Sequence, residues 1–253
     1  MKRFVVFLSA LTAAAAAEAV EVSQDMQTTL GFFDACKQNL TYKFADGRYD
    51  MRTSLTTTGA FGKLYPFTGV YHAFGTYSAN GFVPEDYGYE VQSRSHHRTK
   101  QLTYKDGVPQ TRIKVRDGRR LEEPALVEPD RLADSVDLLS TFGILTEQVL
   151  RTDKCDMKRY SFNGKKYSLS AMQTVGHEEI ETPYFKGNAL KCKYQLEIQK
   201  GASAGVMLNQ DVPIYLWILR DSATDAPFIA KVAAEKTPFG KLEAYTTSIK
   251  VKK

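Results

Sequence analysis

The sequence predicts a mainly β protein: one curved antiparallel sheet or open β-barrel, of the β-spiral kind, with one main α-helix near mid-chain. Two observations support this fold class. Runs rich in Thr, Tyr, Val and Ile, which suit a pleated surface, alternate with turn-forming dipeptides along most of the chain. We count about a dozen such runs, at the spacing expected of a sandwich or barrel. One segment near the middle has helical periodicity instead.

The start of the chain is typical of a secretory signal peptide. Lys2 and Arg3 precede an apolar run over residues 4–17, and Ala17-Glu18-Ala19 forms a small-x-small cleavage site. The run is shorter than the roughly 20 apolar residues that span a bilayer, and no comparable run follows it. We therefore expect a signal peptide over residues 1–19. Residues 20–253 should form a single exported β-rich domain in the periplasm, without a transmembrane segment.

Hairpin turns are predicted at four Asx-Gly dipeptides, because Asx and Gly tolerate the positive φ angles of tight turns. The four are Asp46-Gly47, Asp106-Gly107, Asp117-Gly118 and Asn163-Gly164. The clearest strand covers residues 191–199, where apolar and polar side chains alternate, so one face should be buried and the other solvated. The strands should therefore follow one another as an antiparallel meander.

The helix is predicted from Asp134 to Leu150. Apolar residues recur there at intervals of three and four, which is the period of a helix with one buried face. They are Leu132, Val136, Leu139, Phe142, Leu145 and Val149. Asp134 begins a segment that resembles a capping box, and we expect its carboxylate to accept the first free amides of the helix.

Residues 214–219 form a strand that is apolar on both faces. Such a strand must be covered on both sides, and a concave sheet with a helix laid across it supplies that cover. Core packing is the favoured interpretation, because buried aromatic residues usually serve cores. The alternative is that this strand, which carries the single tryptophan, Trp217, lines a ligand pocket.

The chain has three cysteines, and after export we expect them to be in an oxidising compartment, where disulfides persist. Their spacing is unlike a zinc site, and the sequence alone allows three pairings or three free buried thiols. We favour a disulfide between Cys155 and Cys192. Cys192 lies on the buried face of the alternating strand, and Cys155 opens the preceding hairpin unit, whose turns can fold the chain back. Cys36 would then be the remaining thiol.

No convincing catalytic or metal-binding constellation is evident, so we predict no catalytic residue, no metal and no cofactor. His96 and His97 are neighbours that should point to opposite faces of a strand. The segment 201–205 places Ser203 between glycines, but no strand-to-helix turn is evident there. The formal net charge of +5, or +4 without the leader, is mild and interleaved. Nucleic-acid binding therefore has little support, while a weak attraction to anionic membrane surfaces stays open.

Four segments of the second half share features with a known family. They are the helix start at 134–139, Cys155 with the hairpin at 160–167, the segment 184–192 that ends in Cys192, and the apolar strand with its acidic residue and proline between Pro213 and Pro227. Together they resemble the exported family catalogued as domain of unknown function number 3108, of the alphaproteobacterial type. Asn163 and the pair Lys165-Lys166 replace the family's usual Asp and Arg-Arg.

That family has no agreed activity. Its fold is similar to periplasmic open β-barrels such as the lipoprotein carriers LolA and LolB and the β-spiral protein EipB. The resemblance therefore implies a fold and an exported setting, but fold analogy alone implies no function.

These observations lead to a functional hypothesis with two alternatives. The leading hypothesis is a non-enzymatic periplasmic binding or interaction protein that supports the cell envelope and holds an apolar or lipid-like ligand or a partner peptide in its concave sheet. Its partners would be a lipid, a lipoprotein or an envelope protein. The candidate ligand-lining residues are Leu138, Leu139, Phe142, Tyr215 and Trp217. The alternatives are a structural envelope protein with a solid core and no ligand, and a hydrolase or redox enzyme that uses Cys36.

Overall fold

The computed structural model describes residues 19–78, 81–126, 136–164, 167–198, 212–237 and 240–252. The predicted leader therefore lies outside the described residues, except for Ala19. The described residues form fourteen strands in one sheet, in which every printed pairing is antiparallel, together with two helices. The predicted mainly β class and the open, curved antiparallel sheet are confirmed.

The elements follow the chain in a simple order. They are β1 (Val20–Leu30), β2 (Phe33–Ala45), β3 (Arg48–Thr57), α1 (Gly59–Leu64), β4 (Phe67–Ser78), β5 (Gly81–Ser93), β6 (His97–Lys105), β7 (Val108–Arg116), β8 (Arg119–Pro124), α2 (Leu138–Thr152), β9 (Met157–Phe162), β10 (Tyr167–Glu181), β11 (Lys186–Ile198), β12 (Ile214–Arg220), β13 (Pro227–Thr237) and β14 (Gly240–Lys252).

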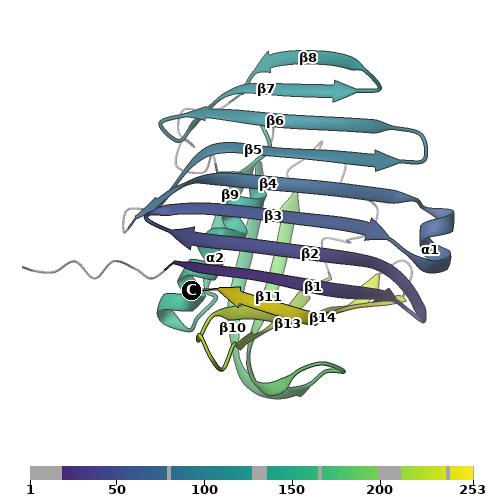
Figure 1. Cartoon of the computed structure of the whole chain (residues 1–253), viewed down its shortest axis with the longest axis vertical. Coiled ribbons are helices and arrows are strands. Elements are labelled where there is room, and N and C mark those ends of the chain that lie inside the picture. The colour runs from purple at the N-terminus through teal and green to yellow at the C-terminus, as the bar shows by residue number, and fades with distance from the viewer. Residues whose placement is uncertain are drawn as a thin grey trace, which may run out of the picture.

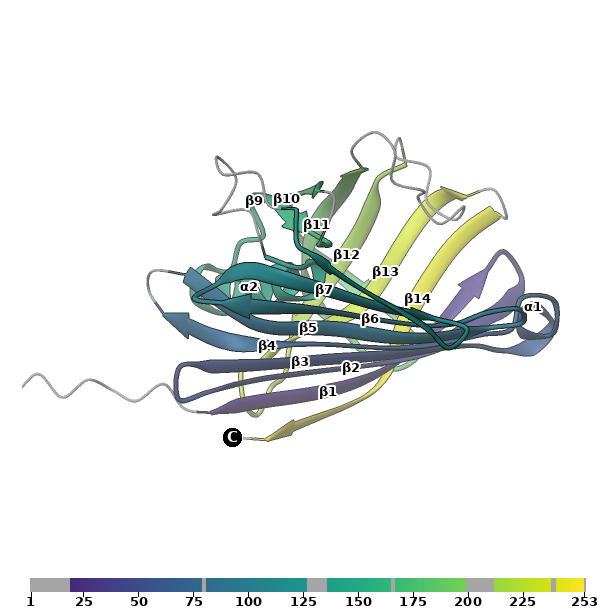
Figure 2. The ribbon, with the colours of Figure 1, turned by 90° about the horizontal axis from the view of Figure 1, so that it is seen from above.

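The sheet runs in the order β8-β7-β6-β5-β4-β3-β2-β1-β14-β13-β12-β11-β10-β9. Strands β1 and β14 pair at its centre, with Glu21 opposite Lys252, so the two ends of the domain lie side by side. Strands β8 and β9 are its edges. The half made of β1–β8 and the half made of β9–β14 run in different directions, and α2 lies between them (Figures 1 and 2).

Three of the four predicted Asx-Gly turns are two-residue hairpin turns. At the first, Ala45 pairs with Arg48, and Asp46 and Gly47 have φ values of 50° and 69°. The turns after β6 and β7 are built in the same way. The fourth turn is longer, since Phe162 pairs with Tyr167 across four residues. There, Gly164 has a φ of 86°.

The main helix begins later than predicted. It covers Leu138–Thr152, and its N-cap is Asp137, whereas the predicted cap Asp134 lies outside the described residues. The amide of Phe162 donates to the carbonyl oxygen of Val136 at 2.8 Å, which ties the residue before the cap to β9. The Asp137 carboxylate accepts the amide of Ser140 at 2.8 Å. Pairing with β9 therefore sets the point at which the helix can start.

The short helix α1 was not predicted. Its six residues carry no apolar periodicity, and none of them is buried. A helix of this length shows no amphipathic repeat, so the sequence offers no signal for it.

The concave face of the sheet is packed against α2. Leu139, Leu145 and Val149 of the helix are buried in the core. Leu139 packs in one cluster with residues of β3, and Leu145 and Val149 pack in another with residues of β10, β11 and β12. The helix contacts β3, β4 and β5 of one half and β9 and β13 of the other. It therefore fills the space between the two halves of the sheet.

The disulfide predicted between Cys155 and Cys192 is present, with the two Cα atoms 6.2 Å apart. It joins the segment after α2 to β11, and both cysteines are fully buried. Cys36 is a free, buried thiol on β2. Burial raises its pKa, which keeps the thiol protonated at neutral pH.

Candidate ligand cavity at the end of helix α2

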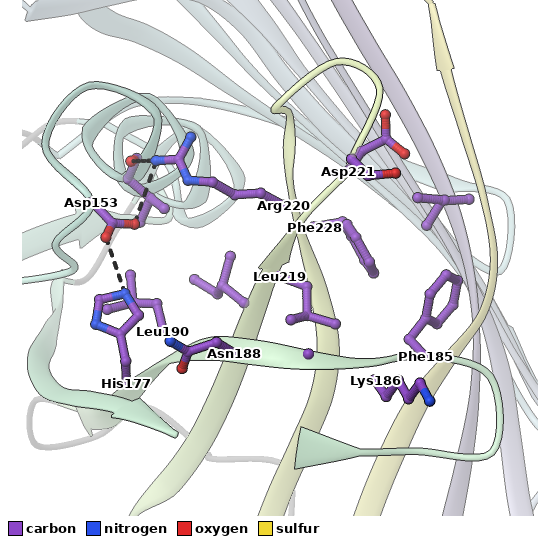
Figure 3. Close-up of a pocket in the computed structure, with 15 residues that line it drawn as sticks. Asp153, His177, Phe185, Lys186, Asn188, Leu190, Leu219, Arg220, Asp221 and Phe228 are labelled. Carbon is purple, nitrogen blue, oxygen red and sulfur yellow. Dashed lines mark hydrogen bonds and ion pairs between the residues drawn. The ribbon is translucent and has the colours of Figure 1, made fainter. Parts of the chain in front are cut away.

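A cavity of about 440 Å³ lies where the C-terminal end of α2 meets β10–β13. Its lining combines an apolar floor with a charged and polar rim, and its principal side chains are shown in Figure 3. The lining residues are Val149, Asp153, His177, Phe185, Lys186, Gly187, Asn188, Leu190, Ile218, Leu219, Arg220, Asp221, Ser222, Phe228 and Ile249.

Asp153 ends the helix and starts the rim of the cavity. It takes the left-handed conformation, with φ 52° and ψ 35°, and its amide donates to the carbonyl oxygen of Val149 at 3.0 Å. This geometry closes the last turn of α2, as left-handed C-terminal residues commonly do. It also places the Asp153 carboxylate between Arg220 and His177 (Figure 3).

Arg220, at the end of β12, fastens the C-terminal end of the helix. Its Nη2 donates to the carbonyl oxygen of Val149 at 2.8 Å and lies 3.5 Å from Asp153 Oδ1. Its Nη1 donates to Asp225 Oδ2 at 2.9 Å. A guanidinium at this point adds a second hydrogen bond to the Val149 carbonyl, which also accepts the Asp153 amide, and it complements the negative end of the helix dipole.

A β-bulge brings His177 to the rim. The register of β10 against β11 shifts between Thr174 and Gly176, and Gly176 has a φ of 145°. After the bulge, His177 lines the cavity and its Nε2 lies 3.0 Å from Asp153 Oδ2. The next residue, Glu178, pairs with Lys191 and Trp217 instead.

The floor of the cavity is apolar. Leu190 of β11 and Ile218 of β12 are buried side chains that pack beside Val149 of the helix. Phe228 of β13 meets Phe185 with ring centroids 5.0 Å apart in an edge-on arrangement. An apolar body could lie on these side chains while polar groups at the rim fix its orientation, which is the usual construction of a small-molecule site.

A second, much smaller hollow of about 30 Å³ lies beside the middle of α2. It shares Val149, Ile218 and Phe228 with the larger cavity, and its lining is otherwise mainly apolar. A space of this size holds about one water-sized group. The helix therefore leaves room for a ligand at its C-terminal end and little room at its middle.

The five predicted ligand-lining residues lie at separate places. Leu138 is exposed at the first turn of α2, Leu139 is buried in the core, and Phe142 lines the small hollow. Tyr215 and Trp217 lie beside each other on β12, with ring centroids 6.1 Å apart. Neither residue is among those that line the two cavities.

Trp217 packs with lysines of the neighbouring strands. Lys191 and Lys231 each lie 5.0 Å from its ring, and its indole N–H donates to Glu178. The Glu178 carboxylate accepts this bond, which lowers its pKa, and the Lys191 bond lowers it further. Aromatic faces and lysine stems thus cover this face of the strand, while Leu216 and Ile218 pack with α2 residues.

The two neighbouring histidines that the sequence draws attention to have separate acidic partners. His96 Nδ1 lies 3.1 Å from Asp117, and His97 Nε2 lies 2.7 Å from Glu90. No group of three or more side chains suited to a metal is present in the part of the chain that the structure describes. The Ser203 segment lies outside the described residues. In the described ranges, no helix has the length and apolar character needed to cross a membrane.

Sequence reasoning missed the larger cavity. Asp153, His177 and Arg220 are separated along the chain, and none belongs to a recognisable motif. Two local signals in the sequence point to parts of the cavity: a Gly inside the β10 run, which can mark a bulge, and an Asp just past the apolar repeat, where a helix ends.

Comparison with known proteins supports the fold. No known family matches the chain, and no curated protein matches it by sequence. The crystal structure of a beta-barrel-like protein of domain of unknown function DUF1849 from Brucella abortus is similar, with a TM-score of 0.53 and 8% sequence identity. The match covers 92% of this chain and 98% of that chain. At this identity the likeness shows a shared β-barrel-like fold, and the resemblance to family 3108 stays a prediction.

Proposed function

We propose that the protein is a non-enzymatic, periplasmic envelope protein that binds an amphipathic ligand at the C-terminal end of α2. The observation that supports this proposal best is the cavity itself, which has an apolar floor and a charged rim. Its volume of about 440 Å³ falls in the range of roughly 300–1,000 Å³ that small-molecule sites occupy. The periplasmic setting rests on the predicted leader, residues 1–19, and on the resemblance to exported family 3108.

The side chains of the site favour a ligand with an apolar body and an acidic head group. Leu190, Ile218 and Phe228 offer an acyl chain or a similar body a dry surface. At the rim, Lys186 is exposed and forms no ion pair with the described residues. A carboxylate or phosphate head could pair with this lysine, whereas Arg220 is already held by Asp153 and Asp225.

Probe binding tests the site directly. The probe is 1-anilinonaphthalene-8-sulfonate, an aromatic anion, displaced by dodecanoate. Asn188 is exposed on the rim, so Asn188→Trp should fill the cavity without disturbing the core and weaken probe binding about tenfold or more. The matched control is Gln195→Trp, an exposed position on the same strand outside the cavity. It should bind the probe as the wild type does.

Native mass spectrometry of protein purified from the periplasm adds a second test. A co-purified lipid or fatty acid that is lost in the Asn188→Trp variant would support the proposal. A clean apo mass, together with no displaceable probe binding in the wild type, would contradict it.

The second candidate is a structural envelope protein without a ligand. The observation that favours it is the packing along α2, where Leu139, Leu145 and Val149 are buried and the hollow beside the middle of the helix is only about 30 Å³. The same experiments separate the two candidates, since a purely structural protein would bind neither dodecanoate nor the probe. The third alternative, an enzyme that uses Cys36, receives no support from a buried thiol whose pKa is raised.

A further inference from the structure

Large apolar side chains are exposed together at one end of the β1–β8 half. Phe32, in the turn between β1 and β2, is 103% exposed, and its neighbour Phe33 is 61% exposed. Leu64 and Tyr65, at the end of α1, are 67% and 55% exposed. Figures 1 and 2 both place α1 and the β1–β2 turn at this end of the sheet. We call this end of the strands the loop edge, which is distinct from the edge strands β8 and β9. It also carries the turns at residues 94–96 and 117–118.

These side chains contribute little to the fold, but the backbone that carries them is firmly held. The amide of Thr58 donates to Ala35 O at 2.9 Å, which fixes the start of α1 against β2. Thr57 Oγ1 donates to Tyr65 O at 2.9 Å, which fixes its end. A Cβ on Gly62 would lie 2.8 Å from Thr57 O, so only glycine allows this close approach. The apolar side chains are thus presented by a rigid support.

The loop edge is also basic. Arg94 Nη2 donates to the carbonyl oxygen of Lys63 at 2.8 Å, and this bond joins the turn after β5 to α1. Four exposed basic residues of the edge form no ion pair with the described residues: Lys63, Arg94, Arg98 and Arg119. Arg116 and Arg120 pair with Asp117 and Glu122, and Lys241, beside the β1–β2 turn, pairs with Glu235 and Glu243, so these charges are compensated. Asp34 is the acidic residue that lies beside the unpaired cations. The opposite end of the same strands is closer to balance, with Asp46, Glu85 and Asp106 against Arg48 and Lys105.

We propose that the loop edge docks the protein onto the surface of an anionic lipid bilayer, with Phe32 and Phe33 inserted among the lipids. Exposed aromatic and aliphatic side chains beside Lys and Arg are the combination that holds a protein at a lipid interface: apolar groups enter the acyl boundary, and cations pair with acidic head groups. The charge of the loop edge favours a bilayer over a neutral apolar partner. This docking surface is separate from the ligand cavity.

Vesicle binding tests the proposal. The full protein is mixed with vesicles of phosphatidylcholine alone or of phosphatidylcholine with phosphatidylglycerol, and co-flotation is measured. The wild type should bind the mixed vesicles at least tenfold more strongly than the neutral ones, and salt should weaken this binding. The double variant Phe32→Ser/Phe33→Ser should lose at least tenfold in affinity. Val83→Ser removes an exposed apolar side chain beside the opposite turn at Gly107, and it should bind as the wild type does.

A tryptophan placed in the β1–β2 turn measures insertion into the bilayer independently of binding affinity. In Phe32→Trp the added fluorescence should be quenched by brominated phospholipids, whereas in Val83→Trp it should not. Binding of the wild type to neither kind of vesicle would overturn the proposal, as would equal binding by Phe32→Ser/Phe33→Ser. Self-association of the wild type that this double variant abolishes, without vesicle binding, would assign the edge to a second copy of the chain and also overturn it.

Discussion

The two ends of helix α2 are held by different kinds of contact: buried polar hydrogen bonds at the N-terminal end and partly exposed charged groups at the C-terminal end. At the N-terminal end, Asp137 is fully buried and its carboxylate accepts the amide and the hydroxyl of Ser140 at 2.8 and 2.7 Å. The Ser140 hydroxyl is in turn 2.9 Å from the hydroxyl of Tyr49. At the C-terminal end, the Asp153 and Arg220 side chains are half and about a quarter exposed, and they border the cavity.

This difference separates a rigid contact from an adaptable one. A dry polar network fixes one position for the first turn of the helix, because a buried polar group that loses its partner is costly. A solvated ion network tolerates rearrangement, because water can replace either partner. The end of α2 that borders the cavity is therefore the end that can adapt to a ligand.

The largest expected effect comes from the disulfide just beyond the C-terminal end. Its removal by Cys155→Ser or Cys192→Ser should lower the free energy of unfolding by about 3–4 kcal/mol, since the bridge closes a loop of 37 residues. Urea unfolding under non-reducing conditions measures this. The double variant should add little to either single one, and a double variant that loses the sum of both would show that the cysteines act separately.

The next effect is a pH dependence at the N-terminal end. Burial raises the pKa of Asp137 to about 6, against about 4 in an unfolded chain. The folded state therefore holds the Asp137 proton more tightly than the unfolded chain does. This protonation adds fully to the free energy of unfolding below about pH 4, and the added stability is lost as the pH rises through about 6. The loss amounts to about 2–3 kcal/mol.

The Asp137→Asn variant isolates this contribution, because asparagine is an equally good N-cap but cannot ionise. The stability difference between the variant and the wild type should grow in the variant's favour from pH 4 to pH 7. Urea unfolding at several pH values measures it. A difference that does not change over this range would show that Asp137 stays ionised in the fold.

A smaller effect is expected from Arg220→Gln at the C-terminal end. The change removes the cation beside the carbonyl of Val149 and leaves Asp153 with His177 alone. Because the Arg220 side chain is partly exposed, the loss of stability should be about 1 kcal/mol. Hydrogen exchange should show faster opening of the last turn of α2. An unchanged exchange rate there would mean that the helix end does not depend on Arg220.

The smallest effect on stability is expected from Asp153→Asn. Asparagine tolerates the left-handed conformation, and the ion pairs of Asp153 are half exposed, so stability should change by less than about 1 kcal/mol. Probe binding should nevertheless change, because the carboxylate lies on the rim of the cavity. A large loss of stability with unchanged probe binding would show that the C-terminal end of α2 serves the fold and not the cavity, contrary to the contrast between the two helix ends.

Local chemistry explains which features could be predicted from the sequence. The Asx-Gly turns, the alternation in β11 and the helical repeat in α2 depend on neighbouring residues, so one sequence suffices to find them. Cys192 was placed on a buried face by the same alternation, and this placement favoured the correct disulfide. The start of α2 was misplaced because a contact with β9, far from the capping residues, decides it.

The sequence by itself therefore determined the fold class, the hairpin order and the buried pattern of the central helix. The tertiary structure alone decided where the cavity lies and that four exposed apolar side chains share one edge. The physical reason is that Asp153, His177 and Phe228 come from three separate elements, and a bulge at Gly176 directs one of them. Contacts between residues from separate elements depend on how the two halves of the sheet curve around the helix, and no local pattern of residues encodes that curvature.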